Sequence, residues 1–193
     1  MPPKRIFVFC GHPSETSFCG SLAQSYATAA QRAGHSVRLL MLSQLEFDDL
    51  HTHYREAPPL EPDLAAFWAN LTWCEHWTIV HPLWWGGLPG RLKGLLDRTL
   101  RPGEAFAPSS GNGFPKPLLV GRSSRTIITA DTPGWFLRWG YGNSIVRQLD
   151  RQILKFCGIR PNRFSVLGPI KHSTEASRQR WLAKAASLGA TAR

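Results

Sequence analysis

The chain alternates short, nearly continuous apolar runs with longer stretches whose apolar residues recur at helical spacing. Five runs are typical of strands: residues 6–10, 37–42, 77–80, 126–129 and 164–167. Strands that are apolar on both faces form a parallel sheet covered by helices on each side, because both faces must be buried. The alternation therefore predicts an α/β fold in which each strand is followed by a helix.

The segments between the strands carry helix signals at their ends. The predicted helices are 19–33 before Gly34, 63–71 after Pro62, 88–100, 144–156 before Gly158, and 174–188 capped by Ser173 or Thr174. Right-handed crossovers then give a doubly wound three-layer sandwich. Ligands of such a sandwich bind beyond the carboxyl ends of the strands, which points to three loops: 11–18, 81–88 and 130–142. We expect the third strand to stop at His81-Pro82.

A length of 193 residues predicts a single domain spanning 1–193, with one loop excursion at about 101–124 that is rich in Pro, Gly and Ser. The composition, 42% hydrophobic and 19% charged, excludes a disordered, collagen-like or coiled-coil chain. No apolar run approaches the roughly 20 residues of a spanning helix, and the run 6–10 is too short for a signal-peptide core. We therefore expect a cytoplasmic protein without membrane insertion.

The four cysteines are scattered and form no C-x-x-C pair, which disfavours both a metal site and a disulfide framework.

The formal net charge is +10, and it is unevenly distributed. Residues 1–100 hold 8 Lys and Arg against 9 Asp and Glu, whereas residues 101–193 hold 15 against 4, a net charge of +11. This charge favours an anionic partner. The basic residues form no cluster and accompany no nucleic-acid-reading motif, so we expect no nucleic-acid partner.

The first loop reads Gly11-His12-Pro13-Ser14-Glu15-Thr16-Ser17-Phe18 and leads into the first helix. It is neither a Walker loop nor a G-x-G-x-x-G turn. Free backbone N–H groups and the helix dipole favour a phosphate there, and the hydroxyls of Ser14, Thr16 and Ser17 and the ring of His12 add donors. The alternative is a plain helix cap with His12 on the surface.

The second loop, His81-Pro82-Leu83-Trp84-Trp85-Gly86-Gly87-Leu88-Pro89, sets two tryptophans beside two glycines at the end of a strand. Flat aromatic walls next to permissive backbone suit a planar ring system in a cleft. A hydrophobic plug or a dimer contact is the alternative. The third loop, residues 130–142, holds four aromatic residues and three glycines and is expected to form another side of the cleft. Its Asp131 is a candidate ligand contact or a turn cap.

These patterns resemble the NAD(P)H:quinone oxidoreductase family, which has the flavodoxin-like fold. The motifs are Gly11-His12-Pro13 with Thr16-Ser17-Phe18; His81 to Gly86 with Pro89; Leu92-Lys93-Gly94 with Asp97-Arg98; and Leu154-Lys155-Phe156-Cys157-Gly158. The resemblance spans Ile6 to about Leu182. It implies a flavodoxin-like three-layer sandwich with a five-stranded parallel sheet in the order 2-1-3-4-5.

The resemblance also implies which residues hold a flavin. It implies that His12, Ser17 and Phe18 bind the flavin phosphate. It also implies that five consecutive residues line the isoalloxazine ring: Pro82, Leu83, Trp84, Trp85 and Gly86. Thr129 closes the opposite edge, with Asp131 and Thr132 beside it. Family members often carry a Thr-Thr-Gly-Gly-like turn there, and this chain has Thr129-Ala130-Asp131-Thr132-Pro133 instead.

The implied activity is hydride transfer from NADPH or NADH through the flavin to a quinone-like acceptor. His81 and Tyr141 are candidate hydrogen-bond donors to the flavin or the acceptor, with a structural hydrogen bond favoured for each. The compact chain favours FMN over FAD, and the basic second half favours NADPH. A homodimer is implied as well. The alternative functions are an ancillary subunit of a membrane transport system and a nucleic-acid-binding protein.

Overall fold

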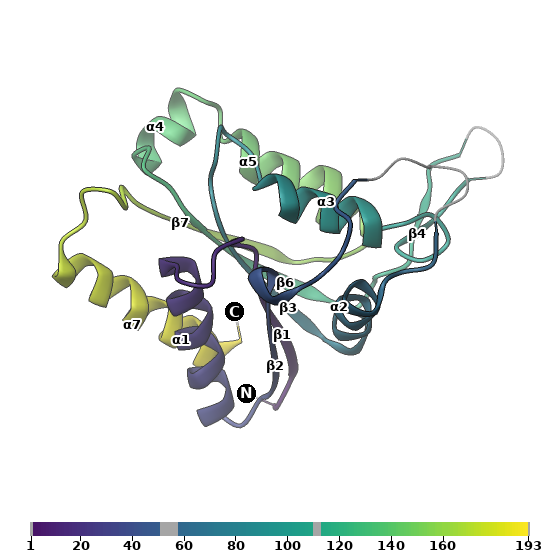
Figure 1. Cartoon of the computed structure of the whole chain (residues 1–193), viewed down its shortest axis with the longest axis horizontal. Helices are drawn as coiled ribbons and strands as arrows, with labels where there is room; N and C mark the ends of the chain where they lie inside the picture. The colour runs from purple at the N-terminus through teal and green to yellow at the C-terminus, as the bar shows by residue number, and fades with distance from the viewer. Residues whose placement is uncertain (1, 51–57, 110–112, 193) are drawn as a thin grey trace.

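A five-stranded parallel sheet forms the centre of the computed structural model, which describes residues 2–50, 58–109 and 113–192 (Figure 1). Its strands are β1 (Arg5–Cys10), β2 (Ser36–Met41), β3 (His76–Pro82), β6 (Ser123–Thr129) and β7 (Asn162–Leu167). They lie in the order β2-β1-β3-β6-β7, and every neighbouring pair is parallel. Counted in chain order, this is the predicted 2-1-3-4-5 arrangement, so the predicted fold class is confirmed.

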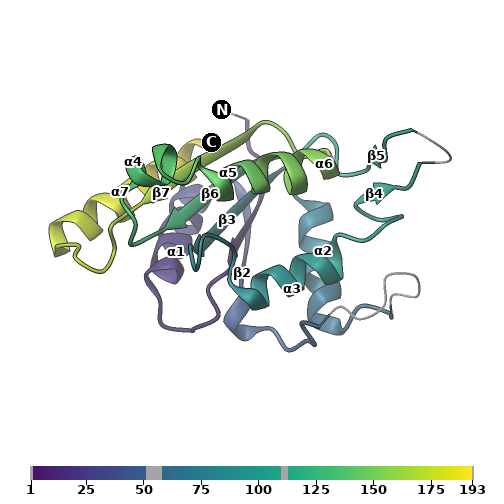
Figure 2. The same ribbon diagram turned by 90° about the horizontal axis from the view of Figure 1, so that it is seen from above.

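Helices cover both faces of the sheet, as Figures 1 and 2 show. The helical elements are α1 (Phe18–Arg32), a short 3-10 turn (Leu42–Gln44), α2 (Pro62–Trp73), α3 (Gly90–Thr99), α4 (Gly134–Trp139) and α7 (Glu175–Thr191). Between α4 and α7, one continuous helix is built from α5 (Ser144–Arg147), a π-helical segment (Gln148–Leu154) and α6 (Lys155–Cys157).

Alternate residues of β1 pack in the hydrophobic cores on opposite faces of the sheet. Phe7 and Phe9 pack with α2 and α3, whereas Ile6 and Val8 pack with α1 and α7. This two-sided burial is what a continuous apolar strand predicts.

The third strand continues through His81 and Pro82, so the prediction that it stops before them was wrong. The pairing of β1 with β3 ends where Cys10 faces Val80. The missing N–H of Pro82 therefore falls beyond the end of β1 and breaks no ladder hydrogen bond. On the other side, the register with β6 runs on to Thr129.

The helix predicted at 144–156 forms, with a π-helical turn in its middle. Its buried residues are Ile145, Leu149, Leu154 and Cys157, and the spacing between the second and the third is five residues. An α-helix brings residues three or four apart to one face, whereas the wider i→i+5 turn accommodates a spacing of five. The π-helical segment thus keeps one apolar side towards the sheet.

Two segments expected as loops contain regular structure. Residues 134–139 form the short helix α4, which begins after Pro133 and ends where the Gly140 N–H donates to the Phe136 carbonyl. Within the excursion 101–124, β4 (Phe106–Ala107) and β5 (Lys116–Pro117) pair antiparallel. Residues 110–112 of that excursion lie outside the described residues.

Candidate functional site

Two adjoining pockets lie at the carboxyl edge of the sheet and bring the three predicted loops together. The inner pocket, about 230 Å³, is lined by His12, Thr16, Ser17, Phe18, Cys19, Pro82, Leu83, Trp84, Thr129, Ala130, Asp131 and Ile170. The outer pocket, about 590 Å³, is lined by Leu83, Trp85, Gly86, Ala130, Asp131, Thr132, Leu137, Tyr141, Asn143, Ser144 and Ile145. Leu83, Ala130 and Asp131 belong to both pockets, so the two form one continuous cleft.

The first turn of α1 presents unpaired backbone donors at the inner pocket. Ser17 is the N-cap, and its Oγ accepts a 3.1 Å hydrogen bond from the Gly20 N–H. The N–H groups of Phe18 and Cys19 have no acceptor among the described residues. An anion at this helix N-terminus would satisfy them and would interact favourably with the helix dipole.

His12 contributes a further donor to the same pocket. Its Nδ1 accepts a 3.0 Å hydrogen bond from the Ser14 N–H, which leaves the proton of the neutral ring on Nε2. Burial lowers the pKa of His12. The ring of Trp84 packs edge-on against the imidazole at 5.5 Å. His12 is therefore a positioned, neutral N–H donor.

The predicted ring-binding loop is a tight turn between Trp84 and Gly87. The backbones of these two residues exchange hydrogen bonds of 3.2 and 2.9 Å. The central residues Trp85 and Gly86 have φ of 49° and 76°, the positive values of a type I′ turn. Their own N–H groups have no partner among the described residues, and the Trp85 side chain is fully exposed. Two free donors thus stand beside an aromatic ring at the cleft.

The end of β6 is tied to its neighbours on both sides. Thr129 Oγ1 lies 3.2 Å from Cys19 Sγ in α1, and its carbonyl accepts from the Leu83 N–H at 2.7 Å. Asp131 Oδ1 accepts a 2.7 Å hydrogen bond from the Lys171 N–H, so this carboxylate braces the loop after β7. Asp131 thus makes a long-range structural hydrogen bond, while the residue also lines both pockets.

Exposed aromatic side chains cluster on α4 and the residues after it, a segment from which Leu137 and Tyr141 line the outer pocket. Trp135, Trp139 and Tyr141 are largely exposed. Phe136 makes edge-on contacts with Trp135 at 5.5 Å and with Tyr141 at 5.0 Å. Arg138 lies over the Trp139 ring at 5.3 Å. Trp135, Phe136, Trp139 and Tyr141, here called the aromatic rim, form a contiguous exposed patch, whereas exposed apolar residues on protein surfaces are commonly isolated.

Two predicted site residues do not line the cleft. Ser14 shapes the loop, because its Oγ donates to the Thr16 carbonyl at 3.3 Å. His81 is fully buried, and its Nδ1 lies 2.8 Å from the Pro82 carbonyl. Burial lowers the pKa of His81 to about 4, although the bond to Pro82 opposes this, so the ring is neutral near pH 7. The structural hydrogen bond that sequence reasoning favoured for His81 is present, whereas Tyr141 lines the outer pocket.

Sequence reasoning missed several lining residues: Cys19, Ala130, Leu137, Asn143, Ser144, Ile145 and Ile170. Ile170 follows β7, whose carboxyl end lies at the same sheet edge, so the strand-end rule would have found it. A Cβ on Gly168 would overlap the Ala130 carbonyl oxygen, and the Ile170 N–H donates to that oxygen at 3.0 Å. This close approach places the loop after β7 against the cleft.

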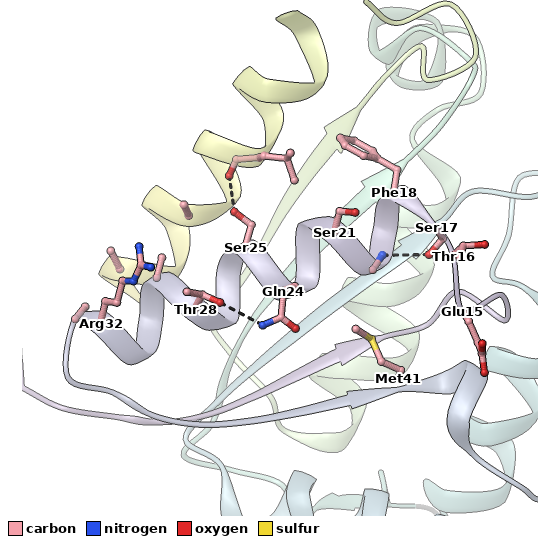
Figure 3. Close-up of a pocket in the computed structure, with 16 residues that line it drawn as sticks. Glu15, Thr16, Ser17, Phe18, Ser21, Gln24, Ser25, Thr28, Arg32 and Met41 are labelled. Atoms are coloured by element: carbon pink, nitrogen blue, oxygen red, sulfur yellow. Dashed lines mark hydrogen bonds between the residues drawn. The ribbon is translucent and has the colours of Figure 1, made fainter. Parts of the chain in front are cut away.

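A larger open groove, distinct from the cleft, runs along α1. Figure 3 shows its lining side chains, among them Gln24, Thr28 and Arg32 of α1 and Met41 at the end of β2. It has a volume of about 1270 Å³ and is lined largely by small and hydroxyl residues. The groove meets the cleft only near the first turn of α1, through Thr16, Ser17 and Phe18.

Two kinds of feature are absent from the described residues. No cluster of three or more His, Cys, Asp or Glu there is arranged to hold a metal ion. Within the same residues, no helix has the length and apolar character needed to cross a bilayer.

Known proteins resemble this chain over nearly its whole length. A relative from Haemophilus influenzae, named an uncharacterized NAD(P)H oxidoreductase, is 26% identical over 186 residues, or 94% of this chain and 91% of the relative. The NAD(P)H:quinone oxidoreductase of Methanothermobacter marburgensis superimposes with a TM-score of 0.81 at 20% identity, covering 98% and 97% of the two chains. An FMN-dependent NADH-azoreductase of Bacillus anthracis, solved in complex with FMN, gives 0.77 at 13% identity, covering 97% and 98%. At these identities the two structures support the fold alone.

The profile of the flavodoxin-like fold family matches residues 4–188, which confirms the resemblance seen in the motifs: the chain belongs to that family.

Proposed function

We propose that this protein is a flavin-dependent NAD(P)H oxidoreductase that uses FMN and reduces quinone-like ring compounds. The observation that carries the proposal is the continuous cleft, which has unpaired backbone donors at two places. One pair belongs to Phe18 and Cys19 at the start of α1, and the other to Trp85 and Gly86 in the tight turn. A flavin mononucleotide needs anion-binding donors at its phosphate and further donors at its ring edge.

The inner pocket fits the phosphate. The N–H groups of Phe18 and Cys19, the Ser17 hydroxyl and His12 Nε2–H supply donors, and in the described part of the pocket the one carboxylate is that of Asp131. That carboxylate is already bonded to the Lys171 N–H. A dianionic phosphate would gain the helix dipole as well as these hydrogen bonds.

The outer pocket fits the ring system. Leu83 and Leu137 supply apolar walls, Trp85 and Tyr141 supply aromatic ones, and the N–H groups of Trp85 and Gly86 can donate to ring carbonyls or nitrogens. When bound, the flavin ring accepts a hydride from a nicotinamide and returns two electrons to an acceptor. The chain's own residues bind and orient the ring and exclude water from one face. No acid–base residue is assigned, because His81 is buried away from the cleft.

Four finer parts of the proposal, namely the flavin, the acceptor, the nicotinamide and the oligomeric state, are supported by other observations. FMN is favoured by the printed name of the Bacillus anthracis azoreductase, and a quinone acceptor by that of the Methanothermobacter marburgensis enzyme. NADPH is favoured over NADH by the net charge of +11 on residues 101–193. A homodimer is proposed from the aromatic rim of the outer pocket, and light scattering of the purified protein tests it.

The visible spectrum of the protein, before and after addition of FMN and then FAD, tests the proposed function. We expect bound FMN that bleaches with NADPH under anaerobic conditions and recovers when a quinone is added. Absence of flavin binding under all conditions would overturn the oxidoreductase proposal and favour the ancillary role.

A single substitution tests the phosphate assignment. We expect Ser17→Asp to weaken FMN binding at least about tenfold, because the new carboxylate faces the phosphate. The fold should survive, since Asp also caps helices well. Flavin fluorescence titration measures the affinity. Riboflavin, which lacks the phosphate, should bind wild type and variant equally. Ser21→Asp places the same charge outside the cleft and serves as the matched control. Equal FMN affinity of Ser17→Asp and wild type would contradict the assignment.

A further inference from the structure

A small pocket lies at the amino edge of the sheet, opposite the cleft. Its volume is about 180 Å³, and it is lined by Lys4, His76, Ser123, Ser124, Pro161, Arg163 and Ala192. His76 and Ser123 begin β3 and β6, and Arg163 lies at the start of β7. The pocket shares no lining residue with the flavin cleft.

His76 has a buried ring nitrogen without a partner at this pocket. The residue is 2% exposed, and its Nδ1 lies 2.8 Å from Ser123 Oγ. The same hydroxyl is 3.5 Å from the Glu75 carbonyl. The contact between Nδ1 and Ser123 Oγ is compatible with both tautomers of the ring; in one of them Ser123 donates to Nδ1 and the ring proton is on Nε2. His76 Nε2 has no hydrogen-bond partner among the described residues. A buried polar atom without a partner is costly.

The charges around His76 are positive. Its pKa is lowered to about 3, first by burial and then by Lys4, Arg125, His35 and Arg163. Glu75, the neighbouring acid, is engaged elsewhere: its carboxylate accepts from the Arg5 N–H at 3.0 Å and pairs with the Arg5 guanidinium at 3.7 Å. With the proton on Nε2, the neutral ring offers a donor in a positive field, which favours an acceptor that carries negative charge.

The other pocket residues add donors of the same kind. Lys4 Nζ reaches the Ala192 carbonyl at 3.5 Å, a long bond that leaves two of its three protons for other acceptors. The Arg163 side chain is exposed and makes no hydrogen bond or ion pair with the described residues. The Ser124 hydroxyl is committed to Asn162 Oδ1 at 2.8 Å. Lys4, His76 and Arg163 thus approach the pocket from three different strands or their ends.

From this arrangement we infer that the pocket is a binding site for a small tetrahedral oxyanion, inorganic phosphate or sulfate, which is held by His76 Nε2–H, the Lys4 ammonium and the Arg163 guanidinium. A volume of about 180 Å³ is large enough for such an ion. The site is independent of the proposed redox function, because its residues take no part in the cleft.

The test follows the His76 ring directly. The full-length Ser17→Asp variant, whose phosphate loop is blocked, is labelled with ¹⁵N-histidine and titrated with inorganic phosphate, with chloride adjusted to hold the ionic strength constant. We expect a saturable shift of the His76 Nε2 resonance and a rise in Tm of about 3 °C well above Kd. Sulfate should compete. Phenyl phosphate, a bulkier monoester, should bind more weakly if the free ion is the ligand and equally well if a monoester is.

Charge variants make the assignment specific. In the same background, Arg163→Gln should weaken phosphate binding about tenfold, since it removes one charge-assisted hydrogen bond. Arg163→Lys should restore part of the affinity. Lys184→Gln removes the same charge from an exposed position of α7 and should leave the affinity unchanged. A His76 resonance that does not respond to phosphate, or equal weakening by Arg163→Gln and Lys184→Gln, would overturn the inference and leave the pocket to water or to nonspecific attraction.

Discussion

Trp85 combines a left-handed backbone conformation with a fully exposed indole ring. The conformation costs a residue with a Cβ about 1–2 kcal/mol, and exposure of the ring gains no burial. Neighbouring Gly86 also has positive φ, but it adopts this conformation without penalty. A strained, exposed tryptophan at the edge of a cleft is explained most simply by a ring that packs on it when the site is filled.

A substitution separates the two roles of Trp85. We expect Trp85→Asn to raise the free energy of unfolding by about 1 kcal/mol, because Asn tolerates positive φ, and to raise Tm by about 2–4 °C. The same change should lower kcat/KM with quinone at least about tenfold, because the aromatic wall is lost. Thermal unfolding and steady-state kinetics measure the two effects. A variant that is less stable than wild type would show that the indole packs in the core after all.

His81 affects stability rather than catalysis. Its pKa is lowered from 6.5 to about 4 in the folded protein, so between these values the unfolded chain binds a proton that the native chain does not. The free energy of unfolding therefore decreases as pH falls from 6.5 towards 4, by about 1.4 kcal/mol for each pH unit. Above pH 7 the residue contributes no pH dependence. His76, with a pKa of about 3, acts in the same direction.

Urea unfolding at pH 7.5, 6.5 and 5.5 checks this effect. We expect the loss of stability between the two lower pH values to be smaller in His81→Gln than in wild type by roughly 1 kcal/mol, because His81 no longer titrates. The buffers should contain no phosphate or sulfate. An unchanged pH dependence in the variant would mean that His81 is protonated in the native state.

The sequence predicted those cleft residues that can be recognised from their immediate neighbours in the chain. Ser17 at a helix start and Trp85 beside Gly86 are recognisable from their neighbours alone. The lining by Ile170 and Asn143 depends on which loops the sheet brings together, so the residue types give no signal. His81 was a candidate donor for which a structural hydrogen bond was favoured, and it is buried because β3 continues through Pro82.

The packing of α1 against α7 depends on a glycine. A Cβ at Gly189 would overlap the Tyr26 carbonyl oxygen of α1. We expect Gly189→Ala to lower the free energy of unfolding by about 3 kcal/mol, because two helix backbones must separate. Gly90→Ala at the start of α3 is the control, since its Cβ meets nothing within 4 Å. It should be neutral or stabilising by about 0.5–1 kcal/mol. Equal effects of the two substitutions, measured by urea unfolding, would contradict this account.

Helices and strands could be predicted from the sequence where a single local pattern determines them. The five sheet strands and the helices between them follow from apolar runs, caps and glycine stops, with ends displaced by a few residues. The π-helical turn was not predicted, because the five-residue spacing from Leu149 to Leu154 is meaningful only when the buried face is known. Helix α4 was hidden by its composition, since Gly134 and Gly140 at its ends are typical of a loop.

At the scale of the whole molecule, the positive charge should affect the choice of nicotinamide. NADPH carries a 2′-phosphate that NADH lacks, so attraction to the basic half of the chain acts more strongly on it. Arg138 and Arg147, close to the outer pocket, form no ion pair within the described residues. We expect the KM for NADPH to rise several-fold between about 50 and 300 mM salt, and that for NADH to rise much less. Parallel salt dependences in steady-state kinetics would show that the charge does not select NADPH.

The contact between Lys4 and Ala192 joins the first strand to the last helix at the edge of the sheet away from the cleft. Because these two positions lie side by side, a short linker can bridge them. The same placement decides how the protein is best handled. A tag, a surface tether or a fused domain at either of these positions lies far from the cleft and leaves it open to solution, but it crowds the pocket formed by His76 and Arg163.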